Sequence, residues 1–140
     1  MRRWGPAPDY YRAAVFHREV GGDGVVSEAT LRAILDTVRH PVVFVDTDHV
    51  IRYLNRAAEQ RYYRQRGLSD LVGSSLFDCH KPESREAILR QYGRLEAGEH
   101  EFFVKINDEN ERVSVVAVRD RNGALLGYYE RIEPAGGASP

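Results

Sequence analysis

The last third of the chain holds three segments of alternating polar and apolar residues, which constrain the fold more than any other feature. They are EFFVKIN, RVSVVAVR and ALLGYYERI. A period of two is typical of strands that face a core on one side. Asp108–Asn110 and the dipeptide Asn122-Gly123, which separate the segments, are short turn sequences. The sequence therefore predicts an antiparallel meander of three strands.

The first half of the chain predicts two helices and two more strands. Ser27 can cap a helix that must end before Pro41, because proline disfavours helical geometry in the preceding residue. The strand-like segments PVVFVD and VIRYLN flank the polar turn Asp46–His49, which indicates a β-hairpin. Asn55 can cap a short helix that Gly67 closes. The apolar stripe of the first helix consists of Leu31, Ile34, Leu35 and Val38.

A long helix is predicted between Pro82 and Gly98. Pro82 needs no amide partner in a first helical turn, and Glu83 faces the positive end of the helix dipole. Gly93 lowers the helix propensity, which suggests a close backbone contact there. The residues expected on the inner face are Ile88, Tyr92 and Leu95. The order of helix, hairpin, short helices, long helix and three strands predicts an α+β fold.

The composition excludes several classes of protein. A chain of 140 residues with a net charge of -1 has no general attraction to nucleic acid or to an anionic membrane. No apolar run is long enough to span a bilayer. Cys79 is the only cysteine, and a lone cysteine stays reduced in the cytosol. We therefore expect a cytoplasmic protein without nucleic-acid or membrane partners.

Three regions are expected along the chain. Residues 1–26 form an N-terminal appendage, partly helical, that ends in a glycine-rich joint. Its aromatic residues predict docking on the sheet or on a second copy of the chain, and a partly ordered tail is the alternative. Residues 27–134 form the main domain, and residues 135–140 a disordered tail.

The segments VVFVDTDHVIRYLNRAAEQ, LVGSSLFD and VAVRDRNGALLGYYERIE, in this order, resemble the PAS domain family. The resemblance covers Ser27–Glu133 and implies a five-stranded antiparallel sheet with short helices and one long helix on one face. It also implies a cavity between the sheet and the helices. The matching positions Asp46, Asn55 and Gly73 are interpreted as structural, setting a turn, a helix cap and a backbone bend.

The stretch Gly73–Ser84 joins the two halves of the chain and holds Cys79 and His80. Its Asp-Cys-His-x-Pro element is similar to that of a subset of prokaryotic PAS-type proteins. The light-sensing branch of the family places its flavin-adduct cysteine three residues after the link glycine, where this chain has Leu76. Cys79 is therefore interpreted as a small core residue rather than as a photochemical group.

His80 borders the cavity in the fold that the resemblance implies, and a neutral imidazole is a good iron ligand. Haem-binding members take their histidine from the long helix, which has none here. The favoured interpretation is that the His80 ring bonds backbone groups and fixes the turn. No metal site is predicted, because nothing requires His40, His49 or His100 to converge. The resemblance allows haem or flavin, no motif supports either, and the cofactor stays open.

The aromatic residues are the remaining candidates, because tyrosine hydroxyls can orient a polar ligand inside a cavity, although aromatic rings also fill cores. On the exposed sheet face, Tyr128 or Tyr129 with Val115 or Val116 offers a partner surface. The candidate ligand-binding residues are His80, Cys79, Phe77, Tyr53, Tyr92 and Asn55.

The leading functional hypothesis is a sensory or ligand-binding PAS module that signals through dimerisation or contact with another protein. The chain has no room for an output domain, so we expect a homodimer, a separate signalling partner and an unidentified small molecule. The alternative is a ligand-free interaction module whose cavity is filled by aromatic residues. A small acid/base enzyme would use residues such as Asp46, Asp78, Tyr53 or His80. No catalytic motif is present, and we do not expect an enzyme.

Overall fold

The computed structural model describes residues 25–136, and the chain divides into two units between Leu35 and Asp36. Most of the predicted N-terminal appendage, including its short helix, and residues 137–140 of the predicted tail lie outside the described residues. The domain limits expected from the sequence therefore stay predictions.

Helix α2 (Glu28–Asp36) begins where the sequence predicts it. The Ser27 hydroxyl accepts a hydrogen bond from the Thr30 backbone N–H at 3.1 Å, which confirms the predicted cap. None of the α2 residues is buried. The exposed apolar side chains of this helix are Leu31, Ile34 and Leu35.

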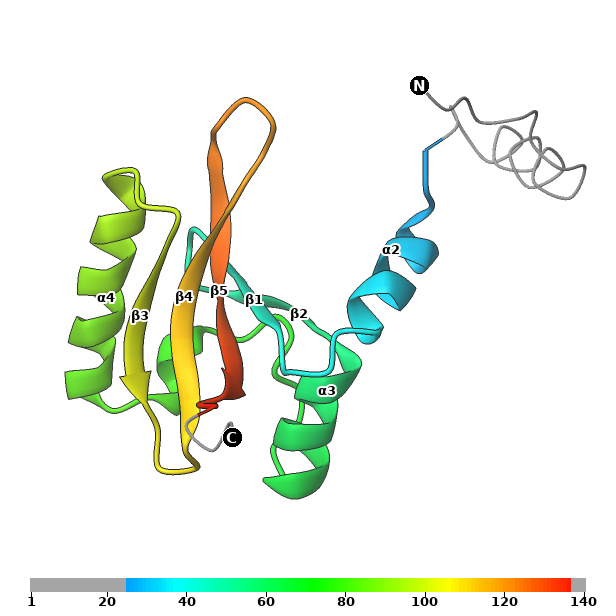
Figure 1. Ribbon diagram of the computed structural model, residues 1–140, viewed down its shortest axis with the longest axis horizontal. Coiled ribbons are helices and arrows are strands. Elements are labelled where there is room, and N and C mark those ends of the chain that lie inside the picture. Colours follow the sequence, from blue (N-terminus) through cyan, green and yellow to red (C-terminus); the bar gives the residue numbers. More distant parts are fainter. Residues whose placement is uncertain (1–24, 137–140) are drawn as a thin grey trace, which may run out of the picture. The chain divides into compact units, whose positions relative to one another are not determined.

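The second unit contains one five-stranded antiparallel sheet with the strand order β2-β1-β5-β4-β3 (Figure 1). The predicted hairpin and the predicted meander are both present, and β5 joins them at the centre of the sheet. The five-stranded antiparallel fold is thus confirmed. The strands are β1 (Val43–Asp46), β2 (Ile51–Leu54), β3 (Glu101–Ile106), β4 (Glu111–Arg119) and β5 (Leu125–Pro134).

The short helices differ in detail from the prediction. Asn55 caps α3 (Arg56–Glu59), which widens directly into the π-helical segment η1 (Gln60–Gln65). Gly67 closes this segment in a left-handed conformation, with a φ of 71°. A single 3-10 turn, η2 (Leu76–Cys79), then leads into the long helix. The sequence indicated the cap and the closing glycine but not the change of helix type.

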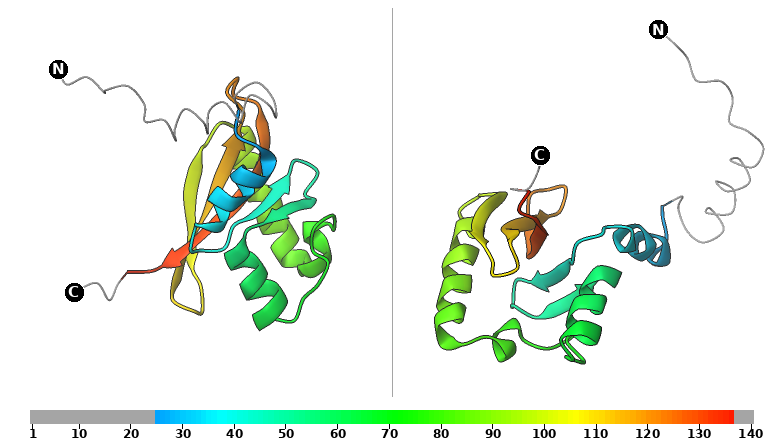
Figure 2. Two further views of the ribbon diagram at one scale, coloured as in Figure 1. Left: turned by 90° about the vertical axis from the view of Figure 1, so that its right-hand side faces the viewer. Right: turned by 60° about the horizontal axis from the view of Figure 1, so that its bottom comes forward.

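Helix α4 (Pro82–Glu96) packs on the inner face of the sheet and lies beside β3 (Figures 1 and 2). Leu95 is fully buried, and Ile88 and Tyr92 pack against the same core, as predicted. The expected close contact at Gly93 is absent, since a Cβ atom added there would meet nothing within 4 Å. The prediction for Gly93 was therefore wrong.

Opposed residues of neighbouring strands share a face of the sheet. Val115 opposes Glu130, and Ala117 opposes Tyr128, so all four side chains lie on the inner face that the helices cover. Tyr128 and Val115 are buried there and cannot form the predicted outer partner surface. Val116 opposes Tyr129 on the other face, where both are half-buried. The core consists of Val45, Ile51, Leu54, Ala58, Leu95, Phe102, Val115 and Tyr128.

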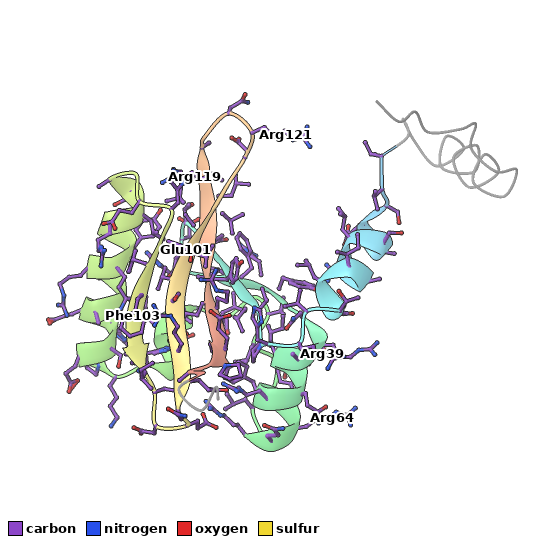
Figure 3. All side chains as sticks on the ribbon, viewed as in Figure 1. Arg39, Arg64, Glu101, Phe103, Arg119 and Arg121 are labelled. Carbon is purple, nitrogen blue, oxygen red and sulfur yellow. The ribbon has the colours of Figure 1, made fainter. Side chains whose placement is uncertain are left out.

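The outer face of the sheet is covered by charged side chains. Glu101 and Phe103 lie along β3 (Figure 3), and the Arg112 guanidinium sits 4.3 Å from the centre of the Phe103 ring. The Arg131 guanidinium on β5 donates hydrogen bonds to two carboxylates. Its Nη1 atom lies 3.1 Å from Glu101 Oε1, and its Nε atom lies 3.2 Å from Glu133 Oε1. Each exposed ion pair adds little stability, but together they keep this face polar.

Candidate ligand-binding site

A cavity of about 510 Å³ lies between the inner face of the sheet and the helices of the second unit. This volume is in the range of small-molecule sites in proteins. All five strands, η1 and α4 contribute to its wall. Its apolar lining includes Val43, Val45, Ile51, Leu71, Leu76, Ala87, Ile88, Val104, Val113 and Ile132.

Glu130 brings a carboxyl group to the cavity wall, beside apolar residues of the sheet. Its register opposite Val115 places it on the inner face, between Tyr128 and Ile132. Enclosure by protein atoms raises the pKa of the Glu130 carboxyl, because burial penalises the charged form, while Lys105 and His80 act in the opposite direction. The side chain nevertheless remains accessible to solvent, because it borders the cavity rather than the packed core.

Lys105 reaches the same face through an irregularity in β3. The register between β3 and β4 shifts between Phe103 and Lys105, so that Lys105 opposes Val113. Such a bulge changes the face to which the following side chains point. Lys105 and Glu130 therefore share the inner face on strands that β4 separates, with backbones about 10 Å apart. No hydrogen bond or ion pair joins them.

Two further cations in the wall are already neutralised. Arg61 on η1 forms a two-bond ion pair with Glu111 on β4, at 3.1 and 2.6 Å. The hydrogen bonds from Arg61 hold the pKa of the Glu111 carboxyl below its usual range. Arg66 pairs with Glu109 at 3.0 Å. These pairs tie η1 and the residue after it to the β3–β4 hairpin.

His80 lies in the cavity wall directly before α4. Its ring nitrogen Nδ1 is 2.8 Å from the Leu76 carbonyl oxygen, a distance that fits a hydrogen bond donated by the ring. The backbone bond expected for this histidine is therefore present. The same bond fixes the ring orientation, so one imidazole both stabilises the turn and faces the cavity.

Phe77 and Tyr92 are candidates that the cavity lining does not include. Both rings pack on His49 instead. The centre of the His49 ring lies 4.9 Å from that of Phe77 and 4.8 Å from that of Tyr92. His49 adopts a left-handed backbone conformation. Its Nδ1 atom lies 2.8 Å from the Tyr128 hydroxyl oxygen. These four residues fill the space beside the cavity as an aromatic cluster.

Tyr53 and Asn55 also lie outside the cavity lining. The Tyr53 hydroxyl donates to the Asp36 carboxylate at 3.4 Å. Asn55 is completely buried and bonds to four backbone groups, which confirms its predicted role as a helix cap. The side chain of Cys79 lies outside what the structure describes, so its predicted role stays a prediction.

The residues of the enzyme hypothesis do not meet in one site. Asp46 accepts the backbone N–H groups of Asp48 and Val50 and pairs with Arg52, which confirms its predicted turn role. Gly73 has a φ of 92°, as expected for a backbone bend. Of the four proposed acid/base residues, the cavity lining includes only His80. Within residues 25–136, no group of three His, Cys, Asp or Glu side chains could hold a metal ion.

The sequence interpretation missed Glu130 and Lys105. The sequence does contain a signal for Glu130. It lies between Tyr128 and Ile132 at a position where the alternating pattern calls for an apolar, inward-facing residue. Lys105 carries no such signal, because the bulge that turns it inward is a property of the pairing between β3 and β4.

Comparisons with known proteins agree with this architecture. The family model described as PAS fold matches residues 35–135, which is most of the chain. This protein belongs to the PAS fold family. No significant match exists among curated proteins. Within residues 25–136, no helix is long and apolar enough to cross a bilayer.

Solved structures with the same fold include the following three. A C-terminal domain from Streptococcus mutans is 22% identical, with a TM-score of 0.64 over 81% of this chain and 88% of that one. The PAS domain of a protein from Colwellia psychrerythraea is 18% identical, with a TM-score of 0.54 over 76% and 97%. A sensory box sensor histidine kinase from Vibrio cholerae is 16% identical, with a TM-score of 0.53 over 89% and 98%. The assignment of the Asp78-Cys79-His80 element to a prokaryotic subset stays a prediction.

Proposed function

We propose that this protein is a cytoplasmic sensory PAS module that binds a small molecule in the cavity between sheet and helices. The observation that carries the proposal is the cavity itself, which has a volume of about 510 Å³, is lined by both apolar and polar side chains, and is not filled by the aromatic residues near it. The similarity to a sensory box sensor histidine kinase supports a sensory role. The residues proposed to meet the ligand are His80 and Glu130.

The proposed signal is a population shift. A ligand between the sheet and α4 favours one arrangement of these elements, and the sheet passes the difference to a partner protein or a second copy of the chain. Tyr128 offers a route, because it lines the cavity and contacts His49 in the β1–β2 turn. The identity of a cofactor such as haem or flavin is left open.

Filling the cavity tests the proposal. Ala87 on α4 lines the cavity, so Ala87→Trp is expected to place an indole in the ligand space. Native mass spectrometry of freshly purified wild-type protein should show a retained small molecule, and the variant should retain at least about tenfold less. An absorbance spectrum of the same material distinguishes haem, flavin and colourless ligands.

Leu89→Trp is the matched control, because Leu89 is exposed on the same helix and is not part of the cavity lining. This variant should retain the ligand as the wild type does. Absence of any bound molecule from all three proteins contradicts the ligand-binding proposal and favours the ligand-free interaction module. Equal retention by Ala87→Trp and wild type places the ligand elsewhere.

Dimerisation is a second candidate function, favoured by the apolar stripe of α2. Leu31, Ile34 and Leu35 recur at helical spacing, and all three are exposed in the described residues. An exposed stripe of this kind is typical of a helix that pairs with another surface. Light scattering of the purified chain is expected to give the mass of a dimer. A monomeric mass at all accessible concentrations contradicts a homodimer.

A further inference from the structure

Helix α4 turns two uncharged polar side chains toward the cavity. The residues of this helix that line the cavity are Ser84, Ala87, Ile88 and Gln91. They lie at intervals of three, four and seven positions from Ser84, so all four share one face of the helix. Seven residues of α-helix place Ser84 and Gln91 about 10 Å apart along the helix axis. This strip of the wall therefore has a polar group at each end and an apolar middle.

The Ser84 hydroxyl and the Gln91 amide have no partner in the protein. Both side chains are half-buried, and neither makes a hydrogen bond in the described part of the chain. Polar groups withdrawn from solvent are usually bonded to protein or to bound water. The half-buried serines Ser74 and Ser75, for comparison, bond to the backbone of their own turn. The two groups on α4 are therefore available to a molecule inside the cavity.

The charged side chains of the lining offer no enclosed counter-charge to a ligand. Arg61 is half-buried, but it is already paired with Glu111. The other charged lining residues are exposed to solvent, and they are Arg66, Lys105, Asp108, Glu109 and Glu130. Exposed charges keep their hydration and attract a ligand charge only weakly. A charged group that entered the cavity would lose its own hydration without compensation, so an uncharged ligand is favoured.

We propose that the cavity binds an elongated, uncharged molecule with a hydrogen-bonding group at each end. One end bonds to the Ser84 hydroxyl and the other to the Gln91 amide, while the apolar middle lies over the residues between them. A hydroxyl and an amide can each donate and accept, so hydroxyl and carbonyl groups of the ligand both fit. These contacts add to those proposed for His80 and Glu130. The inference rests on the proposed function, because it names the ligand class of the same cavity.

A matched set of eight-carbon probes tests the ligand class. 1,8-Octanediol has a hydroxyl group at each end and 1-octanol has one, whereas 8-hydroxyoctanoate and 8-amino-1-octanol replace one hydroxyl by a charged group. Each probe is titrated against the full chain by calorimetry. The wild type should bind the diol at least as tightly as 1-octanol, and at least about tenfold more tightly than either charged probe. A cavity without polar contacts prefers 1-octanol, because burying a hydroxyl without a partner is unfavourable.

Two variants of α4 locate the contacts. Gln91→Leu replaces the amide by an apolar side chain, so it should weaken the diol at least about tenfold without weakening 1-octanol, whose retained binding shows that the cavity is intact. Ser84→Ala should weaken the diol in the same direction. Gln65→Leu is the matched control, because Gln65 is exposed on η1 and is not part of the cavity lining. This variant should bind every probe as the wild type does.

The outcomes separate this inference from the proposed function. The inference is overturned if the wild type binds 1-octanol or a charged probe more tightly than the diol, or binds none of the four. Equal diol binding by the wild type and Gln91→Leu overturns it too. If Gln91→Leu also loses 1-octanol, Ser84→Ala decides, and unchanged diol binding by that variant counts against the inference. The cavity itself is judged by the molecule retained in native mass spectrometry, which depends on no assumption about ligand class.

Discussion

Replacing Asn55 by alanine is expected to destabilise the protein by about 3–5 kcal/mol, because one buried amide holds two segments of the backbone together. Its Oδ1 atom accepts the backbone N–H groups of Val42 and Ala58, each at 2.9 Å. Its Nδ2 atom donates to the carbonyl oxygens of Val38 and His40, at 3.3 and 3.1 Å. Alanine leaves these groups without a side-chain partner at a position where water has no access. Denaturant unfolding measures the loss.

Two other variants distinguish the cap from a general effect of losing an amide. Asn55→Asp keeps an oxygen that accepts from the two N–H groups, but it places a second oxygen against the two carbonyl oxygens. It should therefore be more stable than Asn55→Ala and less stable than the wild type. Asn122→Ala makes the same chemical change at an exposed turn residue, and should change stability by less than about 0.5 kcal/mol. If Asn55→Ala is as mild as Asn122→Ala, Asn55 does not have the structural role assigned to it.

The order of the elements could be predicted because its signals are local. Ser27 and Asn55 are caps, and Pro82 occupies the first turn of α4, as the sequence suggests. The turns of the meander likewise follow from residues within a few positions of each other. Each such residue acts on the backbone beside it, so its effect can be predicted without knowing how the rest of the chain folds.

The candidate site could be predicted only in part, because its residues are selected by strand pairing. Glu130 and Lys105 face the cavity through their registers with Val115 and Val113. Phe77 and Tyr92 were expected near the ligand but pack on His49, which lies in the β1–β2 turn, far from them in the sequence. His80 was found because it lies at a helix entrance, which is itself a local feature.

The two glycines Gly93 and Gly127 show the same limit. Gly93 drew attention because glycine is unfavourable in a helix, yet the space around it is open. Gly127 interrupts a strand-like run, and among the described glycines it is the one at which a Cβ atom has no room. The one local sign of the close approach is the glycine itself, because an isolated glycine within a strand suggests that another backbone comes near; which strand approaches is set by the pairing of β1 with β5.

Gly127→Ala is therefore expected to be severely destabilising, by about 3 kcal/mol or more. A Cβ atom at this position would lie 2.1 Å from the Val45 carbonyl oxygen and 2.7 Å from the Phe44 ring. The carbonyl belongs to the backbone of β1, so it cannot move without breaking the pairing of β1 with β5. That pairing rests on Val45 opposite Tyr128 and Asp46 opposite Gly127. Differential scanning calorimetry should show a much lower Tm.

Gly93→Ala is the matched control, since it adds the same methyl group in open space on the exposed face of α4. It should stabilise the protein by about 0.5–1 kcal/mol, because alanine loses less backbone entropy on folding. The same substitution is thus expected to have opposite signs at two positions. If Gly127→Ala also stabilises, β1 does not approach β5 as closely as the structure has it. The hairpin that supplies Val43, Val45 and Ile51 to the cavity would then be held by α3 and the core alone.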